Sequence, residues 1–174
     1  MKALYWASIF YLVLGLGAGV FYREFTRAND FPEGEFTQLS VAHTHLLALG
    51  FMMSLIFLLL EKVFGLSRNR GQFNAFFWLY NVGVVVTVGV MIWHGCLTVL
   101  GEESTAMISG IAGLGHILIT IGLIAFIAAL GNAISEAHSL LEGACHLSAH
   151  RLHLLLLLYA LCFKRPERDG KAGG

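Results

Sequence analysis

Four histidines stand in otherwise apolar parts of the chain, at His43, His45, His94 and His116. They are the strongest metal-ligating groups in the long apolar stretches, because those stretches contain no Asp, Glu, Lys or Arg. Polar side chains at membrane depth are functional candidates by default. A neutral imidazole ligates zinc, copper and iron. The chemistry that these residues predict is therefore the binding of a metal or of a metal-containing cofactor.

The stretches that hold the histidines are long enough to be membrane spans. A helix needs about 20 apolar residues to cross a bilayer, and charges within it are costly. The chain is 57% hydrophobic and only 13% charged, with a mean hydropathy of +0.73. The sequence predicts an all-α integral membrane four-helix bundle, with spans within residues 3–22, 36–60, 71–101 and 104–135.

Basic residues are distributed unevenly among the connections between these spans. They occur at the N-terminus, between the second and third spans, and after the fourth span. The other two connections are mainly acidic and contain only Arg23 and Arg27 as basic residues. By the positive-inside rule, both termini are expected in the cytoplasm.

The C-terminal part of the chain differs from the spans. Its apolar run, LHLLLLLYALCF, has 12 residues and is followed by the charged segment KRPERDGK. A run of this length is too short to cross a membrane. We expect two parts, a bundle over residues 1–136 and, over residues 137–174, an additional amphipathic helix followed by a disordered basic tail.

The histidines are expected to converge in one layer of the bundle. At a rise of about 1.5 Å per residue, His43 and His94 lie roughly 10 Å below the same membrane surface, and His116 lies roughly 18 Å below it. Each of these three shares a helical stripe with small or polar residues, and such stripes usually face neighbouring helices. We therefore expect His43, His94 and His116 to point inward. His45 projects about 200° away from His43.

A haem suits this donor set better than a bare metal ion. The predicted site has no carboxylate and no paired thiolate, and a porphyrin supplies its own apolar surface. We expect one b-type haem with His43 and His116 as the axial pair and with His45 and His94 as reserve ligands. Arg23 and Arg27 are the nearest cations for its propionates. Two filled axial positions would favour electron transfer, whereas one open position would bind a diatomic gas such as nitric oxide.

Two alternatives remain open. One is a copper or zinc binding or trafficking protein that uses His43, His45 and soft methionine ligands. The other is a structural subunit without a cofactor, whose histidines bond across helices. The spans contain no phosphate-binding loop and no paired carboxylates, so an independent catalytic activity is not expected. The formal net charge of zero gives no basic surface for nucleic acid. The expected partners are the lipid bilayer and a redox partner or a second copy of the chain.

Three segments carry a resemblance to a known family. They are MKALYWASIFYLVLGLGAGVFYREFT, SVAHTHLLALGFMMSLIFLLLEK and SGIAGLGHILITIG. Together they resemble a family of short bacterial membrane proteins of unknown function over roughly residues 1–137, which implies a location in the bacterial inner membrane.

The segment HTHLLALGF also resembles, more distantly, a stretch of the NnrS family and the haem-bearing catalytic subunit of haem-copper oxidases and nitric oxide reductases. This resemblance implies a haem ligand at His43.

Overall fold

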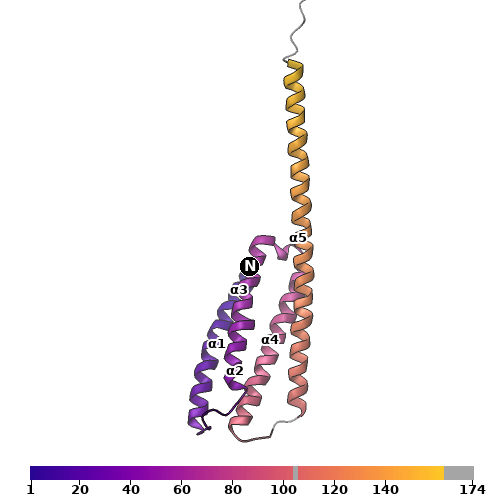
Figure 1. Cartoon of the computed structure of the whole chain (residues 1–174). Coiled ribbons are helices and arrows are strands. Elements are labelled where there is room, and N and C mark those ends of the chain that lie inside the picture. The colour runs from indigo at the N-terminus through magenta and orange to yellow at the C-terminus, as the bar shows by residue number, and fades with distance from the viewer. Residues whose placement is uncertain (104–105, 163–174) are drawn as a thin grey trace, which may run out of the picture. The chain divides into compact units, whose positions relative to one another are not determined.

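The computed structural model describes residues 1–103 and 106–162, and these residues contain helices and no strand. The chain divides into two compact units, Met1–Ala133 and the part from Ile134 onward. Figure 1 shows the elements of the first unit packed side by side. In chain order the helices are α1 (Lys2–Ala28), α2 (Leu39–His45), the π-helix η1 (Leu46–Met52), α3 (Met53–Phe64), the short 3-10 helix η2 (Leu66–Arg68), α4 (Arg70–Val99) and α5 (Ala106–Cys162).

The prediction of an all-α protein with four spans is confirmed. Within the described ranges, four helices are long and apolar enough to cross a membrane: Lys2–Ala28, Leu39–Phe64, Arg70–Val99 and Gly110–Leu141. Many large apolar side chains on their outer faces are exposed, as expected where a helix meets lipid. The helical backbone of α5 continues without a break into the segment expected to be amphipathic. The predicted basic tail, residues 163–174, lies outside the described residues.

The second span contains a π-helical segment directly after His45. This segment is η1, and π-helical turns are often found at functional sites. The hydroxyl of Tyr80 on α4 donates a hydrogen bond of 2.8 Å to the carbonyl oxygen of Leu49 within η1. A polar backbone group inside the bundle therefore receives a partner from a neighbouring helix.

Glycines allow α4 and α5 to pack backbone to backbone. A Cβ atom placed on Gly83 would lie 2.7 Å from the backbone nitrogen of Ile119, and one on Gly122 would lie 2.7 Å from that of Tyr80. A Cβ atom on Gly115 would lie 2.9 Å from the backbone nitrogen of Thr87. These three pairs fix an antiparallel register, and small residues at such positions are typical of helix pairs in membranes.

A second close helix pair joins α1 to the second span. A Cβ atom on Gly15 would lie 2.7 Å from Leu47, and one on Gly19 would lie 3.8 Å from the ring of His43. The ring of His43 therefore packs against α1.

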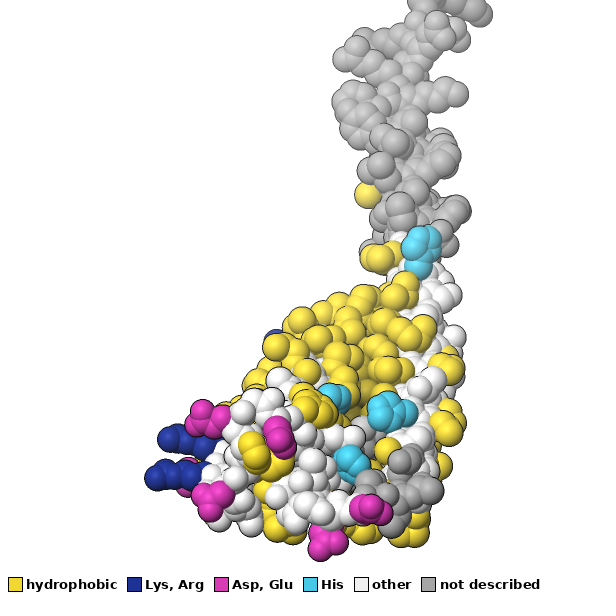
Figure 2. All heavy atoms as spheres, turned by 60° about the horizontal axis from the view of Figure 1, so that its bottom comes forward, with side chains coloured by type: hydrophobic (Ala, Val, Ile, Leu, Met, Phe, Trp, Pro, Cys, Tyr) yellow, Lys and Arg dark blue, Asp and Glu magenta, His cyan; other side chains and the backbone are white. Residues whose placement is uncertain are grey.

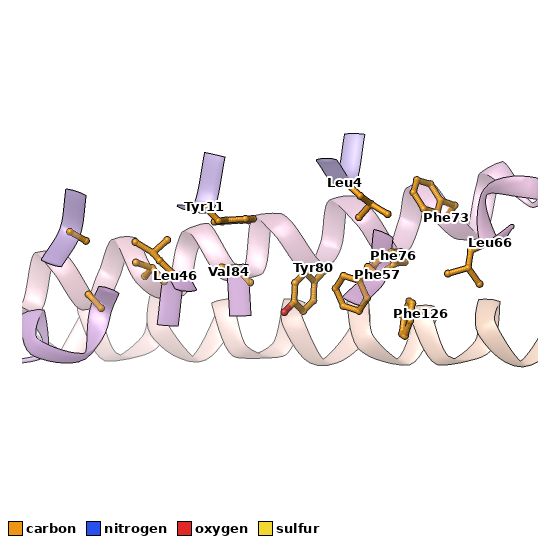
Figure 3. Packing of buried hydrophobic residues seen from close by; sticks show 13 residues of the cluster. Leu4, Tyr11, Leu46, Phe57, Leu66, Phe73, Phe76, Tyr80, Val84 and Phe126 are labelled. Atoms are coloured by element: carbon orange, nitrogen blue, oxygen red, sulfur yellow. The ribbon is translucent and has the colours of Figure 1, made fainter. Parts of the chain in front are cut away.

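A cluster of aromatic rings joins α3, α4 and α5 in the half of the bundle farther from His43 (Figure 3). The ring of Phe57 lies 4.8 Å from that of Phe76, 5.1 Å from that of Tyr80 and 4.6 Å from that of Phe126. Edge-to-face and tilted arrangements at these separations are favourable. The cluster therefore holds α5 close to the second span.

Polar contacts fix both ends of the second span. At its start, the hydroxyl of Thr37 donates a hydrogen bond of 2.9 Å to the carbonyl oxygen of Gly95. At its end, the buried carboxylate of Glu61 accepts hydrogen bonds from the backbone N–H and the hydroxyl of Ser67. Gly65 ends α3 in the left-handed conformation, with φ +66°. The span is therefore anchored in register at each end.

Candidate functional site

The histidines of the first unit lie toward the end of the bundle that carries the acidic connections. We call this the acidic end and define it by Asp30, Glu33, Glu35, Glu102 and Glu103. Figure 2 shows histidine side chains close together at this end, with hydrophobic side chains around them. Lys and Arg side chains lie on another part of the same face.

His45 and His116 have the same hydrogen-bonding arrangement. Nδ1 of His45 lies 2.9 Å from the carbonyl oxygen of Val41, and Nδ1 of His116 lies 2.9 Å from that of Ala112. A carbonyl oxygen can only accept a hydrogen bond, so each Nδ1 carries the proton. In a neutral ring the lone pair is then on Nε2. A bond from the second ring nitrogen to a backbone carbonyl is typical of histidines that ligate a metal.

These two rings also occupy similar levels along the bundle. A Cβ atom on Gly95 would lie 2.5 Å from the backbone nitrogen of Leu39, so these residues are level. His45 is six residues further along, roughly 9 Å deeper. His116 follows Gly115, which packs against Thr87. Gly95 and Thr87 both lie on α4, so the number of residues between them relates the two levels. On this count, His45 and His116 differ by only roughly 5 Å in depth.

The side on which each ring lies separates His45 from His43. His43 packs against Gly19 of α1. His45 follows two residues later and projects about 200° around the helix from it, away from α1. In Figure 1, α1 and α5 lie on opposite sides of the second span. His45 therefore projects away from α1.

His43 and His94 differ from this pair in their hydrogen bonding. In each of these residues Nδ1 is buried and has no hydrogen-bond partner among the described residues. The hydroxyl of Thr87 is in the same state. Buried polar atoms without a partner cost free energy, and in native proteins each calls for an explanation.

The expectation that His116 faces the bundle interior is wrong. Its side chain is exposed, as are the residue Gly113 and the side chain of Thr120 on the same stripe. The interior face of α5 is instead formed by Gly115, Gly122 and nearby apolar residues. Both faces of this helix carry small residues. The expectation that a stripe of small residues faces a neighbouring helix therefore selected the wrong face of α5. His43 and His94 are partly buried and on helix-facing stripes, as expected.

Arg23 and Arg27 lie near the end of α1 and are exposed. The side chain of Arg23 is 78% exposed, and its Nε lies 3.9 Å from Oε1 of Glu24. Both arginines belong to the helix on the opposite side of the second span from α5. Neither forms a hydrogen bond or an ion pair with a histidine among the described residues.

No group of three or more His, Cys, Asp or Glu side chains that could hold a metal ion occurs within the residues described. A haem iron needs at most two axial ligands from the protein, so a pair of imidazoles satisfies it. An apolar groove of about 480 Å³ lies elsewhere, between α1 and α4. Its lining includes Phe10, Leu14, Val88 and Ile92 but no histidine.

Two positioning contacts escaped the sequence analysis. They are the bond from Tyr80 to the carbonyl of Leu49 and the bond from Thr37 to the carbonyl of Gly95. Tyr80 stands beside Asn81 in an otherwise apolar stretch, and it resembles an ordinary interfacial tyrosine. Thr37 lies three residues before Ser40, next to the start of the helix, which is a position typical of caps.

The fold and the histidines define a polytopic membrane protein with four spanning helices and imidazoles from three of them near one end. The chain belongs to the family described as "Protein of unknown function (DUF2871)", which matches residues 1–133. This span coincides with the first compact unit. Comparisons with curated proteins and with solved structures gave no match.

Proposed function

We propose that this protein is an integral membrane b-type haem protein that transfers single electrons, with His45 and His116 as the axial ligands. The observation that carries the proposal is the shared arrangement of these two rings. Both hold the proton on Nδ1 at 2.9 Å from a carbonyl oxygen four residues earlier, which leaves Nε2 free to ligate. Their similar depth along the bundle supports the same pairing.

The exposure of His116 also supports a bound cofactor. A polar ring facing hydrocarbon with a nitrogen lacking a hydrogen-bond partner is costly. Nε2 of His116 has no such partner among the residues that the structure describes. A flat apolar cofactor that binds this nitrogen would remove that cost and cover the exposed face.

His45 replaces His43 in the pair expected from the sequence. The ring of His43 packs on Gly19, on the side of the span away from α5, and its Nδ1 has no carbonyl partner to fix the tautomer. The resemblance of HTHLLALGF to haem-bearing membrane subunits implies a ligand at His43, so the choice of His45 rests on its hydrogen bonding alone.

When bound, a haem with two axial imidazoles supplies one-electron redox chemistry and leaves no open position for a gas ligand. The chain's own contribution is to orient both imidazoles, to hold the tautomer whose lone pair is on Nε2, and to surround the rings with apolar neighbours. We propose that it acts in the bacterial inner membrane beside a redox partner or a second copy of the chain.

The test is to reconstitute the purified protein with haem in mild detergent and to measure haem and copper per chain. We expect one haem per chain, a sharp α band after dithionite reduction and no spectral change with carbon monoxide. His45→Ala and His116→Ala should each abolish this spectrum, whereas the matched control His43→Ala should keep it. Carbon monoxide binding by the wild type would refute the six-coordinate assignment. A colourless protein with stoichiometric copper would refute haem altogether.

A further inference from the structure

An apolar groove follows the line between α1 and α4. It consists of two hollows, of about 480 Å³ and about 430 Å³, whose linings share Phe10 and Val85. On α1 the lining residues run from Ala3 to Phe21, which are roughly 27 Å apart along the helix axis. The hydrocarbon core of a bilayer is about 30 Å thick. The groove therefore extends through most of the depth of the membrane.

The polar side chains of the 430 Å³ hollow bind one another. The hydroxyl of Tyr11 donates a hydrogen bond of 2.8 Å to Oδ1 of Asn81, and Nδ2 of Asn81 donates one of 2.7 Å to the carbonyl oxygen of Phe77. The other side chains of this lining are Ala, Val, Phe and Trp. A polar ligand would lose its hydrogen bonds to water here, whereas a hydrocarbon chain has none to lose.

Two cations stand at the end of the groove where α1 and α4 begin. The amino group of Met1 lies 4.0 Å from Oε1 of Glu61, and the other oxygen of Glu61 accepts a bond from Ser67, shortly before α4. Lys2 and Arg70 are the first residues of these helices, and both are exposed. Neither side chain has a partner among the described residues. A cation at the start of a helix opposes the helix dipole, so neither charge stabilises its own helix.

Both cations lie on the sides of their helices that line the groove. Lys2 is four residues before Trp6, and Arg70 is seven residues before Phe77; residues so spaced lie on one side of a helix. Long cationic side chains extend from such positions toward the headgroups. Trp6 and Trp78, which also line the hollow, are exposed, as is typical of indoles at a membrane interface. This end therefore combines an apolar groove with positive charge above it.

We infer that the groove binds an anionic phospholipid, with one acyl chain in the 430 Å³ hollow and the phosphate at Lys2 and Arg70. Basic residues beside a gap between spanning helices are typical of sites for anionic lipids. A spanning helix of a partner protein would match the apolar lining but not the two cations at its end. The inference is independent of the haem, because no histidine lines either hollow.

The test of the headgroup compares two lipids that have the same acyl chains. Delipidated protein in mild detergent is titrated with dioleoylphosphatidylglycerol, which is anionic, or with dioleoylphosphatidylcholine, which has no net charge, and bound lipid is counted by native mass spectrometry. The wild type should bind the anionic lipid roughly 5-fold to 30-fold more tightly. Lys2→Gln combined with Arg70→Gln should remove this preference. The charge-conserving control, Lys2→Arg combined with Arg70→Lys, should keep it.

The test of the groove uses one substitution at two lipid-facing positions. Val82 lines the 430 Å³ hollow and is exposed, so Val82→Phe should fill the hollow without disturbing the core. It should weaken the binding of both lipids by a similar factor, because their acyl chains are the same. Val63 is exposed on α3 and lines neither hollow, so Val63→Phe should bind both lipids as the wild type does.

The headgroup assignment is wrong if the wild type binds both lipids equally, or if the preference survives neutralisation of Lys2 and Arg70. The groove assignment is wrong if Val82→Phe binds both lipids as tightly as Val63→Phe does. A wild-type dimer that retains no lipid, and that Val82→Phe dissociates, would assign the groove to a second copy of the chain and would also overturn the inference.

Discussion

Replacing Gly115 by alanine should separate α4 from α5 at the level of the proposed site. A Cβ atom on Gly115 would lie 2.9 Å from the backbone nitrogen of Thr87 and 3.2 Å from its Cα, whereas ordinary contact begins at 3.4 Å. The helices must therefore move apart by about 0.5 Å, which loses a quarter or more of the local dispersion energy. Overpacking of this kind costs about 1–3 kcal/mol.

Gly113→Ala is the matched control for this change. It lies on the same helix, two residues away, and a Cβ atom there meets nothing within 4 Å. Alanine is favoured over glycine within a helix by about 0.5–1 kcal/mol, so the control should be slightly more stable than the wild type. The assay is SDS-induced unfolding in mixed micelles, followed by circular dichroism. If Gly115→Ala is as stable as Gly113→Ala, the close packing of α4 on α5 is wrong.

Other substitutions test the contacts that hold the second span. Tyr80→Phe should lower the free energy of unfolding by about 0.5–1.5 kcal/mol. It should also shift the infrared band of a ¹³C-labelled Leu49 carbonyl to higher frequency, because the carbonyl loses its hydrogen bond. An unchanged band would contradict the bond. Phe57→Ala should cost about 3–5 kcal/mol in unfolding free energy, whereas Leu59→Ala on the lipid-facing side of the same helix should be nearly neutral; equal losses would contradict the aromatic cluster. Glu61→Gln should lower the unfolding midpoint, because a buried charge-assisted acceptor is lost; an unchanged midpoint would show that this cap does not stabilise the fold.

The spans could be predicted because charge is excluded from hydrocarbon along the whole length of a helix. Each predicted span agrees with a spanning helix to within a few residues at most boundaries, and the exceptions are informative. The first helix extends to Ala28 past the charges of Arg23 and Glu24, since helix formation does not stop at the membrane surface. The connection that follows this helix contains Pro32 and Gly34, and Gly34 has φ +89°.

The orientation of the histidines was harder to predict than their presence. A stripe of small residues indicates a helix contact only when the opposite face has none. On α5 both Gly113 and Gly115 belong to such stripes, and only Gly115 packs against a neighbour. The π-helix η1 is also invisible to a count of 3.6 residues per turn. The hydrogen bonds that distinguish His45 from His43 depend on side-chain geometry and not on spacing.

The central claim is that His45 and His116 are the two axial ligands of one haem. The most direct measurement is low-temperature electron paramagnetic resonance of the ferric, haem-loaded protein and its single variants. We expect a low-spin bis-imidazole signal in the wild type and in His43→Ala. We expect a high-spin signal, or no bound haem, in His45→Ala and in His116→Ala. A low-spin signal that survives in either of these two variants would contradict it.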